Sequence, residues 1–190
     1  MKQPDFQGAD RLIAMLDAAV RLPTVADITA AIKQGLCGLV NNQELVLPRA
    51  VQTECGDHYA RRLLYKSEQH GYSVVAMTWG PEQGTVLHDH AGMWCVEAVC
   101  SGRIKVTQYE LLEQRGGQYR FERRGAVEAE VGSAGCLIPP HEYHTIANCC
   151  GENCAVSLHI YGGDMTQCHV FESRDGEWYT RATRALAYDA

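Results

Sequence analysis

The sequence lacks the features that mark several large classes of protein. No apolar run approaches the ~20 residues that a membrane-spanning helix needs. The first ten residues, MKQPDFQGAD, contain no apolar core of the kind found in secretory signals. Acidic residues outnumber basic ones by 23 to 17, and no basic stripe is present to hold phosphates. We therefore expect neither a membrane nor a nucleic acid as a partner.

Cysteine, in contrast, is abundant, with nine in 190 residues. In a chain without an export signal, cysteines are expected as reduced thiols rather than disulfides, which favours the cytoplasm. The fractions of hydrophobic and charged residues, 46% and 21%, are those of a globular protein with one substantial core. Neither a linker nor a repeat divides the chain, so we expect one domain over residues 1–190. We also expect a monomer.

Two helices are predicted within residues 1–45. Apolar residues recur every three or four positions in residues 8–20 and again in residues 25–40. Pro23 separates the two segments, because proline cannot extend the first helix, and Asn41 begins a stop signal for the second. The pattern predicts an N-terminal α-helical cap.

From about residue 63 onward, short segments rich in Val, Ile, Tyr and Thr alternate with turns that contain Gly or Pro. The expected strands are 73–79, 85–88, 95–101, 103–113, 118–123, 136–138, 144–148, 155–161 and 168–172. Strands this close together, with no long helix between them, indicate an antiparallel barrel or jelly roll. We expect a mainly β protein with its barrel over residues 55–172.

Two histidine-bearing segments form the candidate metal site. His88 and His90 lie at the end of an expected strand, where residues two apart point to the same face and can reach one ion. A second segment, PPHEYHTIAN over residues 139–148, contains His144 and Asn148.

These segments resemble the two motifs of the cupin superfamily, HxH followed by Glu and Gly, then a third His followed by Asn. Cys95 stands where the acidic ligand of the first motif would be. The resemblance implies a cupin barrel with three neutral ligands, His88, His90 and His144. The common iron triad, in contrast, has two histidines and one carboxylate. Without the carboxylate, a metal keeps more positive charge and suits an anionic thiolate.

Three alternative ligands stay open. Asp89 lies between the two histidines, although in a strand it points away from their face. Glu97 has the same parity as Cys95 and could fill the acidic position. His141 could replace His144, although its place before Glu142 is more typical of a turn.

Within the cupins, residues 55–172 resemble the cysteine dioxygenase family. Its first site block resembles residues 79–95, which read WG and then HDHxxxxC. Its second resembles residues 144–161, which read HxxxN and then SLHIY. The resemblance implies an Fe(II)-dependent enzyme that uses dioxygen to oxidise the thiol of L-cysteine to cysteine sulfinate. Its partners would be dioxygen and a small thiol.

Ser157, His159 and Tyr161 alternate along one expected strand, so a single face presents all three. Taken alone, they fit a hydrogen-bonded core network equally well. The family resemblance implies that Ser157 orients His159, which orients the Tyr161 phenol towards the substrate and dioxygen. Cys95 and Tyr161 match residues that form a thioether cross-link in some family members. The alternative is an ordinary buried cysteine.

The segment that begins Tyr59-Ala60-Arg61 resembles the family's carboxylate anchor. A guanidinium offers a planar fork that matches a carboxylate, and the resemblance implies that Arg61, helped by Tyr59, holds the substrate. Arg62 points the opposite way in an extended segment, so we expect it on the surface. Relatives that prefer 3-mercaptopropionate tend to carry Gln at the anchor, so Arg61 favours an amino-acid substrate.

Two departures from the family pattern concern substrate preference rather than reaction type. Gly162-Gly163 stands where the family often has Ser-Pro-Pro, and residues 91–94, AGMW, are more apolar than in the animal enzymes. Two other functions stay open. One is the same chemistry on 3-mercaptopropionate, and the other is a metal-binding cupin without oxygenase activity, such as an isomerase or a sensor.

Overall fold

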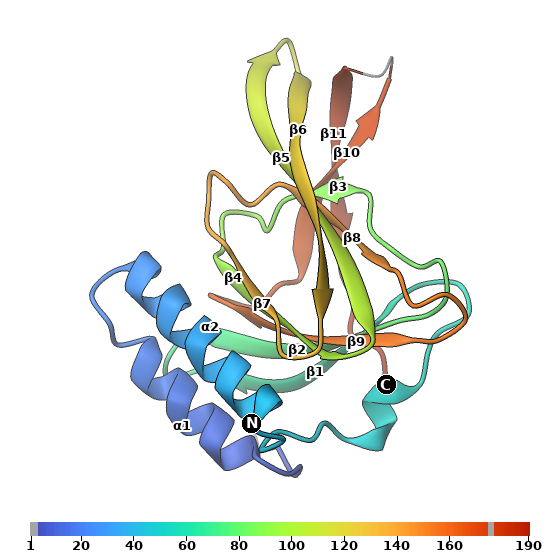
Figure 1. Ribbon diagram of the computed structural model, residues 1–190. Coiled ribbons are helices and arrows are strands. Elements are labelled where there is room, and N and C mark those ends of the chain that lie inside the picture. Colours follow the sequence, from blue (N-terminus) through green and yellow to red (C-terminus); the bar gives the residue numbers. More distant parts are fainter. Residues whose placement is uncertain (1–3, 175–176) are drawn as a thin grey trace.

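The computed structural model describes residues 4–174 and 177–190, which form two sheets and two N-terminal helices (Figure 1). The helical elements are α1 (Ala9–Ala19), α2 (Val25–Asn41) and the 3-10 helix η1 (Arg49–Gln52). The strands are β1 (Ala60–Ser67), β2 (Tyr72–Trp79), β3 (Leu87–His88), β4 (Cys95–Ser101), β5 (Arg103–Arg115), β6 (Gln118–Glu130), β7 (Ala134–Leu137), β8 (His144–Asn148), β9 (Ala155–Tyr161), β10 (Gln167–Ser173) and β11 (Trp178–Ala185).

Both predicted helices are present, with bounds within one residue of those expected. Gly8 precedes α1 with a φ of 84°, and a Cβ there would lie 2.1 Å from the Glu44 carbonyl oxygen. Only glycine fits that position. The α2 helix begins after Thr24, whose hydroxyl accepts a hydrogen bond from the Asp27 amide at 3.1 Å. Local sequence therefore sets the start of α2, whereas the glycine before α1 is required by its contact with Glu44.

The strands form two antiparallel sheets. The first has the order β1-β2-β9-β4-β7, and the second has the order β10-β11-β6-β5-β8-β3. The second sheet closes on itself because β3 pairs with both β8 and β10. This mainly β architecture with two N-terminal helices confirms the expected fold class.

Strand β9 shows how the sequence builds the interior. All seven of its residues are buried. Val156, Leu158 and Ile160 pack in one cluster with apolar residues of α1 and α2, which lie along one side of the barrel in Figure 1. The alternate residues, Ser157, His159 and Tyr161, face the barrel interior. The period of two therefore separates a helix-packed face from a polar inner face.

Two strands were not predicted, and a third, β6, extends far beyond its expected end. β1 was anticipated only as an extended segment, and β11 lies beyond the expected end of the barrel at residue 172. β6 continues to Glu130, whereas the prediction ended at 123. The outer part of β6 and most of β11 are exposed, so neither has the buried alternation that reveals a strand. Hydrogen bonds to neighbouring strands hold them in place instead, with β6 paired to β5 and β11 paired to β10.

Two further expectations concern the state of the cysteines and the character of the helices. All nine cysteines are free thiols, in agreement with the expectation of reduced cysteine. Within residues 4–174 and 177–190, neither helix combines the length and apolar character needed to cross a membrane.

Candidate active site

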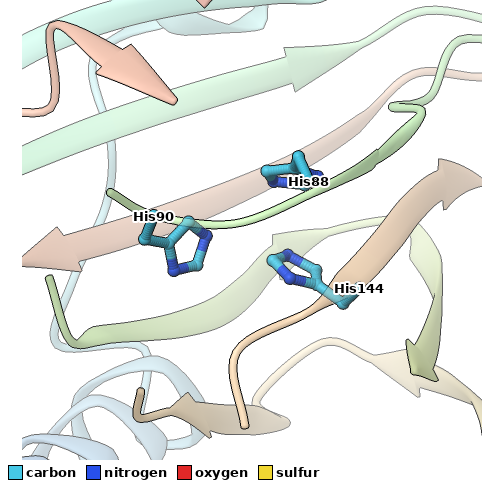
Figure 2. Close-up of side chains that lie close together, drawn as sticks. All are labelled: His88, His90 and His144. Atoms are coloured by element: carbon cyan, nitrogen blue, oxygen red, sulfur yellow. The ribbon is translucent and has the colours of Figure 1, made fainter. Parts of the chain in front are cut away.

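Three histidines from two strands meet inside the barrel. His88 ends β3, His90 follows two residues later, and His144 begins β8 directly opposite His88 in the strand register. One ring nitrogen from each lies within 4.8 Å of those of the other two. The three rings face a common space (Figure 2). Nitrogen atoms at this separation can hold one metal ion.

Hydrogen bonds and burial keep these rings neutral, with a nitrogen lone pair left to bind a metal. His144 Nδ1 lies 2.7 Å from the Glu142 carbonyl oxygen, and His88 Nδ1 lies 3.1 Å from that of Val86. A ring nitrogen facing a carbonyl carries the proton, so Nε2 keeps its lone pair. Burial holds the pKa of His90 and His144 well below the usual value, so both rings are neutral.

Two buried nitrogens in this cluster have no hydrogen-bond partner among the described residues, His90 Nδ1 and His144 Nε2. An unpartnered buried polar atom costs ~1–3 kcal/mol. A divalent metal ion would remove that cost, and neutral imidazole is the form that binds one. The donor set therefore fits a metal such as iron.

The three alternative ligands lie elsewhere. Asp89 turns away from the cluster, and its Oδ2 is 2.8 Å from His169 Nδ1. His141 is exposed and is not part of the cluster. Glu97 faces His159 instead, with 3.5 Å between Oε2 and Nδ1.

Beside the cluster lies the predicted series of polar groups on β9. Ser157 Oγ is 2.7 Å from His159 Nε2, and the Tyr161 hydroxyl is 3.4 Å from His159 Nδ1. Trp79 Nε1 donates to Ser157 Oγ at 2.9 Å. The indole N–H can only donate, so the Ser157 oxygen accepts from Trp79, and its contact with Nε2 extends the series to His159. The Tyr161 hydroxyl completes the series beside His159 Nδ1.

Burial keeps each of these groups neutral. It lowers the pKa of His159 to about 3, with the Arg61 charge adding to the effect. Burial, and then the neighbouring Cys95, raises the pKa of Tyr161 well above its usual value. Burial, and then Glu97, likewise raises the pKa of the Cys95 thiol. Cys95 is directly opposite Tyr161 across β4 and β9 and is held as a thiol, which is a poor metal ligand.

The cavity at the cluster is small, about 20 Å³, which is room for about one water-sized sphere. Arg61 and Tyr59 both line it. The Arg61 guanidinium is buried and donates from Nη1 to the Ala187 carbonyl at 3.0 Å and from Nη2 to that of Met165 at 2.9 Å. A guanidinium has five N–H groups, so these two bonds leave three.

The comparisons with known proteins agree with this geometry. The family model described as "Cysteine dioxygenase type I" matches residues 55–174. The chain belongs to the cysteine dioxygenase type I family. The residues matched include all three histidines, the series on β9 and Arg61.

Among curated relatives of the family, the zebrafish (Danio rerio) "Cysteine dioxygenase type 1" is 25% identical over 123 residues, which are 64% of this chain and 60% of that protein. The human (Homo sapiens) protein of the same name is 24% identical over 106 residues, 55% of this chain and 52% of that protein. The chain thus matches little more than half the length of these relatives. A solved Thermus thermophilus structure resembles the chain with a TM-score of 0.47 and 16% identity, over 62% of this chain and 95% of that one.

The two departures from the family pattern contact each other. A Cβ at Gly162 would lie 2.3 Å from Trp94 Nε1, and one at Gly163 would lie 2.7 Å from the Met93 sulfur. The Gly162 amide also donates to the Trp94 carbonyl oxygen at 3.0 Å. The glycine pair after Tyr161 therefore makes room for the apolar side chains that precede Cys95. The glycine pair and the apolar segment before Cys95 therefore pack together and depart from the family pattern jointly.

One expectation near the site is wrong. Arg62 is buried, not on the surface, and donates to Thr78 Oγ1 at 3.3 Å and to the Ala190 carbonyl oxygen at 3.1 Å. Its side chain does leave β1 on the face opposite Arg61. That face is covered by the segment around Val51, whose carbonyl accepts the Thr78 hydroxyl, and by the last residues of the chain.

Two further residues had no role assigned from sequence. Trp79 begins the first site block of the resemblance, and it stacks on Tyr59 with 4.6 Å between ring centroids and donates to Ser157. Arg184 pairs with Cys168 across β10 and β11 and lines the cavity as a second guanidinium. No motif covers β11, so nothing in the sequence indicated Arg184.

Proposed function

We propose that the chain is a thiol dioxygenase that converts L-cysteine to cysteine sulfinate, with Fe(II) held by His88, His90 and His144. The strongest support is that three kinds of group line one cavity: the neutral histidine cluster, the phenol of Tyr161 and the guanidinium of Arg61. Family membership supports the reaction class, whereas the identity of the thiol rests on the site.

Bound to the three imidazoles, Fe(II) would supply the centre at which a thiol and dioxygen react. The stoichiometry is RSH + O₂ → RSO₂H, with both oxygen atoms ending on sulfur. Oxidation of a thiol to a sulfinic acid releases four electrons and dioxygen accepts four. No external reductant is therefore needed.

The protein's own groups would bind and orient the substrate. Arg61 keeps three N–H donors beyond its two backbone bonds, enough to take a carboxylate on one side. Tyr59, stacked on Trp79, forms the adjacent wall. Burial keeps the Tyr161 phenol protonated by raising its pKa, and its ring lies 5.5 Å from that of His90, where the hydroxyl would donate to the reacting atoms.

Substrate entry requires a local movement, because cysteine is larger than the present cavity of about 20 Å³. The wall contains the Arg184 side chain, which is exposed, and Leu186, whose amide donates to the Thr166 carbonyl at 2.8 Å. In this proposal the Arg184 side chain moves aside, since it can rotate without breaking the core.

Oxygen uptake by the iron-loaded protein tests the proposal. L-cysteine, 3-mercaptopropionate and cysteamine are each added in an oxygen electrode without 2-oxoacid or nicotinamide cofactor, and the products are identified by mass spectrometry. We expect one dioxygen consumed per cysteine sulfinate formed. Preference for 3-mercaptopropionate would favour the first alternative, and no uptake with any thiol would favour a cupin without oxygenase activity.

We also infer a cytoplasmic monomer, on the basis of the free thiols and the absence of an expected partner surface in the sequence. Cell fractionation tests the location, and size-exclusion chromatography with light scattering tests the oligomeric state.

A further inference from the structure

A second and much larger cavity lies in the barrel beyond His159. Its volume is about 310 Å³, and none of the three clustered histidines lines it. The walls are mainly apolar and include Val99, Ile104, Val106, Ala129 and Leu137. His159 and Ile146 line both this cavity and the one at the cluster, so these side chains separate the two spaces.

The one acidic side chain in this lining is Glu97. It lies on β4 between Val96 and Ala98, which pack towards the helices, so its own side chain points inward. The side chain is 10% exposed, and Oε2 has no hydrogen-bond partner among the described residues. The nearest ionisable nitrogen is His159 Nδ1 at 3.5 Å, on a ring that burial keeps neutral.

A buried carboxylate oxygen without a donor is costly, and such a group in a native protein indicates a ligand or a function. His159 does not neutralise Glu97. Burial raises the pKa of Glu97 to about 7 and lowers that of His159 to about 3, so the pair is not a stable ion pair near neutral pH. The carboxylate is therefore available to a donor that enters the cavity.

The cavity opens to solvent on the side away from the histidines. Ala126, Val127 and Ser133 line it and are exposed, and Val127 is 66% exposed. A molecule can thus enter between β6 and β7 without passing through the cavity at the cluster.

We propose that this cavity binds a small molecule with an apolar body and one amino group, with the ammonium beside Glu97. A volume near the lower end of the ~300–1,000 Å³ range of ligand pockets, apolar walls and a single polar anchor are the features of such sites. An ammonium supplies both the missing donor and the opposite charge. The inference uses none of the clustered histidines and does not rest on the proposed function.

Isothermal titration calorimetry with the iron-loaded full chain tests the proposal, with 2-phenylethylamine as the probe. The comparison compounds are 2-phenylethanol, which has the same body without the charge, and 3-phenylpropionate, which has the opposite charge. We expect saturable binding of the amine, at least tenfold tighter than either comparison compound. Affinity should also increase from pH 6 to pH 8 as Glu97 ionises.

Three variants locate the site. Glu97→Gln should weaken amine binding at least tenfold. Glu128→Gln, which removes the same charge from the opposite face of β6, should leave it within twofold. Val127→Trp places a larger side chain at the exposed mouth, on the cavity-facing side of β6, and should abolish binding without disturbing the core. The proposal is overturned by any of three results: no saturable amine binding, equal effects of the two Gln variants, or normal binding in Val127→Trp. The Val127→Trp result also decides the matter if Glu97→Gln does not fold.

Discussion

The two sides of His159 differ sharply although two strands, β8 and β9, contribute to both. On one side, ring nitrogens, a phenol and a guanidinium surround a cavity of about 20 Å³. On the other, apolar side chains and one carboxylate surround about 310 Å³. Strands β8 and β9 contribute to both, because Ile146 and His159 line the two cavities.

The difference shows that period-two alternation fixes only which residues face inward. What each part of the interior can do then depends on side-chain size and charge at neighbouring inward positions. Around the cluster, aromatic rings fill the space and leave lone pairs directed at one point. Beyond His159, Val, Ala and Gly residues leave the space open.

The largest expected effect is on metal binding at the cluster. His144→Ala should remove most of the bound iron, since His144 supplies one of the three converging nitrogens and two imidazoles bind a metal far more weakly. The measurement is the iron content of purified protein by plasma mass spectrometry. His141→Ala is the matched control, an exposed histidine three residues earlier, and should retain its iron. Full iron retention in His144→Ala would mean that the second motif is misassigned.

The next effect concerns the phenol on the same side. Tyr161→Phe should lower the turnover rate by about 10²-fold or more, the scale of a positioned proton donor, with a smaller change in KM. Cys95→Ala should be slower than wild type but active, because the phenol remains in place. Steady-state oxygen uptake checks both, at matched iron content.

The reverse order would contradict these roles. An inactive Cys95→Ala together with a near-normal Tyr161→Phe would require Cys95 to be considered as a ligand, despite its neutral thiol.

A smaller effect is expected on the affinity for the substrate, through the Arg61 guanidinium. Arg61→Ala should raise KM for cysteine by the equivalent of about 2–4 kcal/mol, as for a broken charge pair in a desolvated site. Cysteamine, which lacks the carboxylate, should be a poor substrate of the wild type. Arg62→Ala is the matched control, because it removes a buried guanidinium from the opposite face of β1. It should reduce stability and leave KM unchanged. Equal turnover of cysteine and cysteamine would show that Arg61 does not anchor a carboxylate.

Most of the candidate site residues could be proposed from sequence because they lie in or beside strands with recognisable spacing. The HxH spacing at the end of one strand and the SxHxY spacing along another correctly indicated which side chains face the barrel interior. The structure brings the side chains of each motif together. The helices were equally readable from their apolar spacing and from the stop at Asn41. These features depend on local sequence alone.

What could not be predicted depends on contacts between distant segments. Arg62 is buried only because the end of the chain covers it, and Arg184 reaches the cavity only because β11 pairs with β10. Gly162 is explained by Trp94, whose ring occupies the space of the missing Cβ. None of these contacts leaves a periodic signal in the sequence.

The smallest expected effect concerns stability on the far side of His159. Burial raises the pKa of Glu97 to about 7 from its ordinary 4.5. The folded state therefore favours the protonated carboxyl, and this stabilisation is present below pH 4.5 and is lost as pH rises through 7. Relative to Glu97→Gln, the wild type should lose on the order of 2–3 kcal/mol of unfolding free energy between pH 5 and pH 8. Urea denaturation at both values measures this.

Other groups near Glu97 do not mask that signal. The titratable neighbours are His159, Cys95, Tyr161 and Cys136, and burial disfavours the charged form of each. Each therefore keeps its charge state between pH 5 and pH 8 and cancels in the comparison with Glu97→Gln. An amine bound beside the carboxylate would reverse the trend, since it stabilises the ionised form. Repeating the pH 8 titration with saturating 2-phenylethylamine should then restore stability to the wild type alone, and a gain of equal size in Glu97→Gln would place the amine elsewhere.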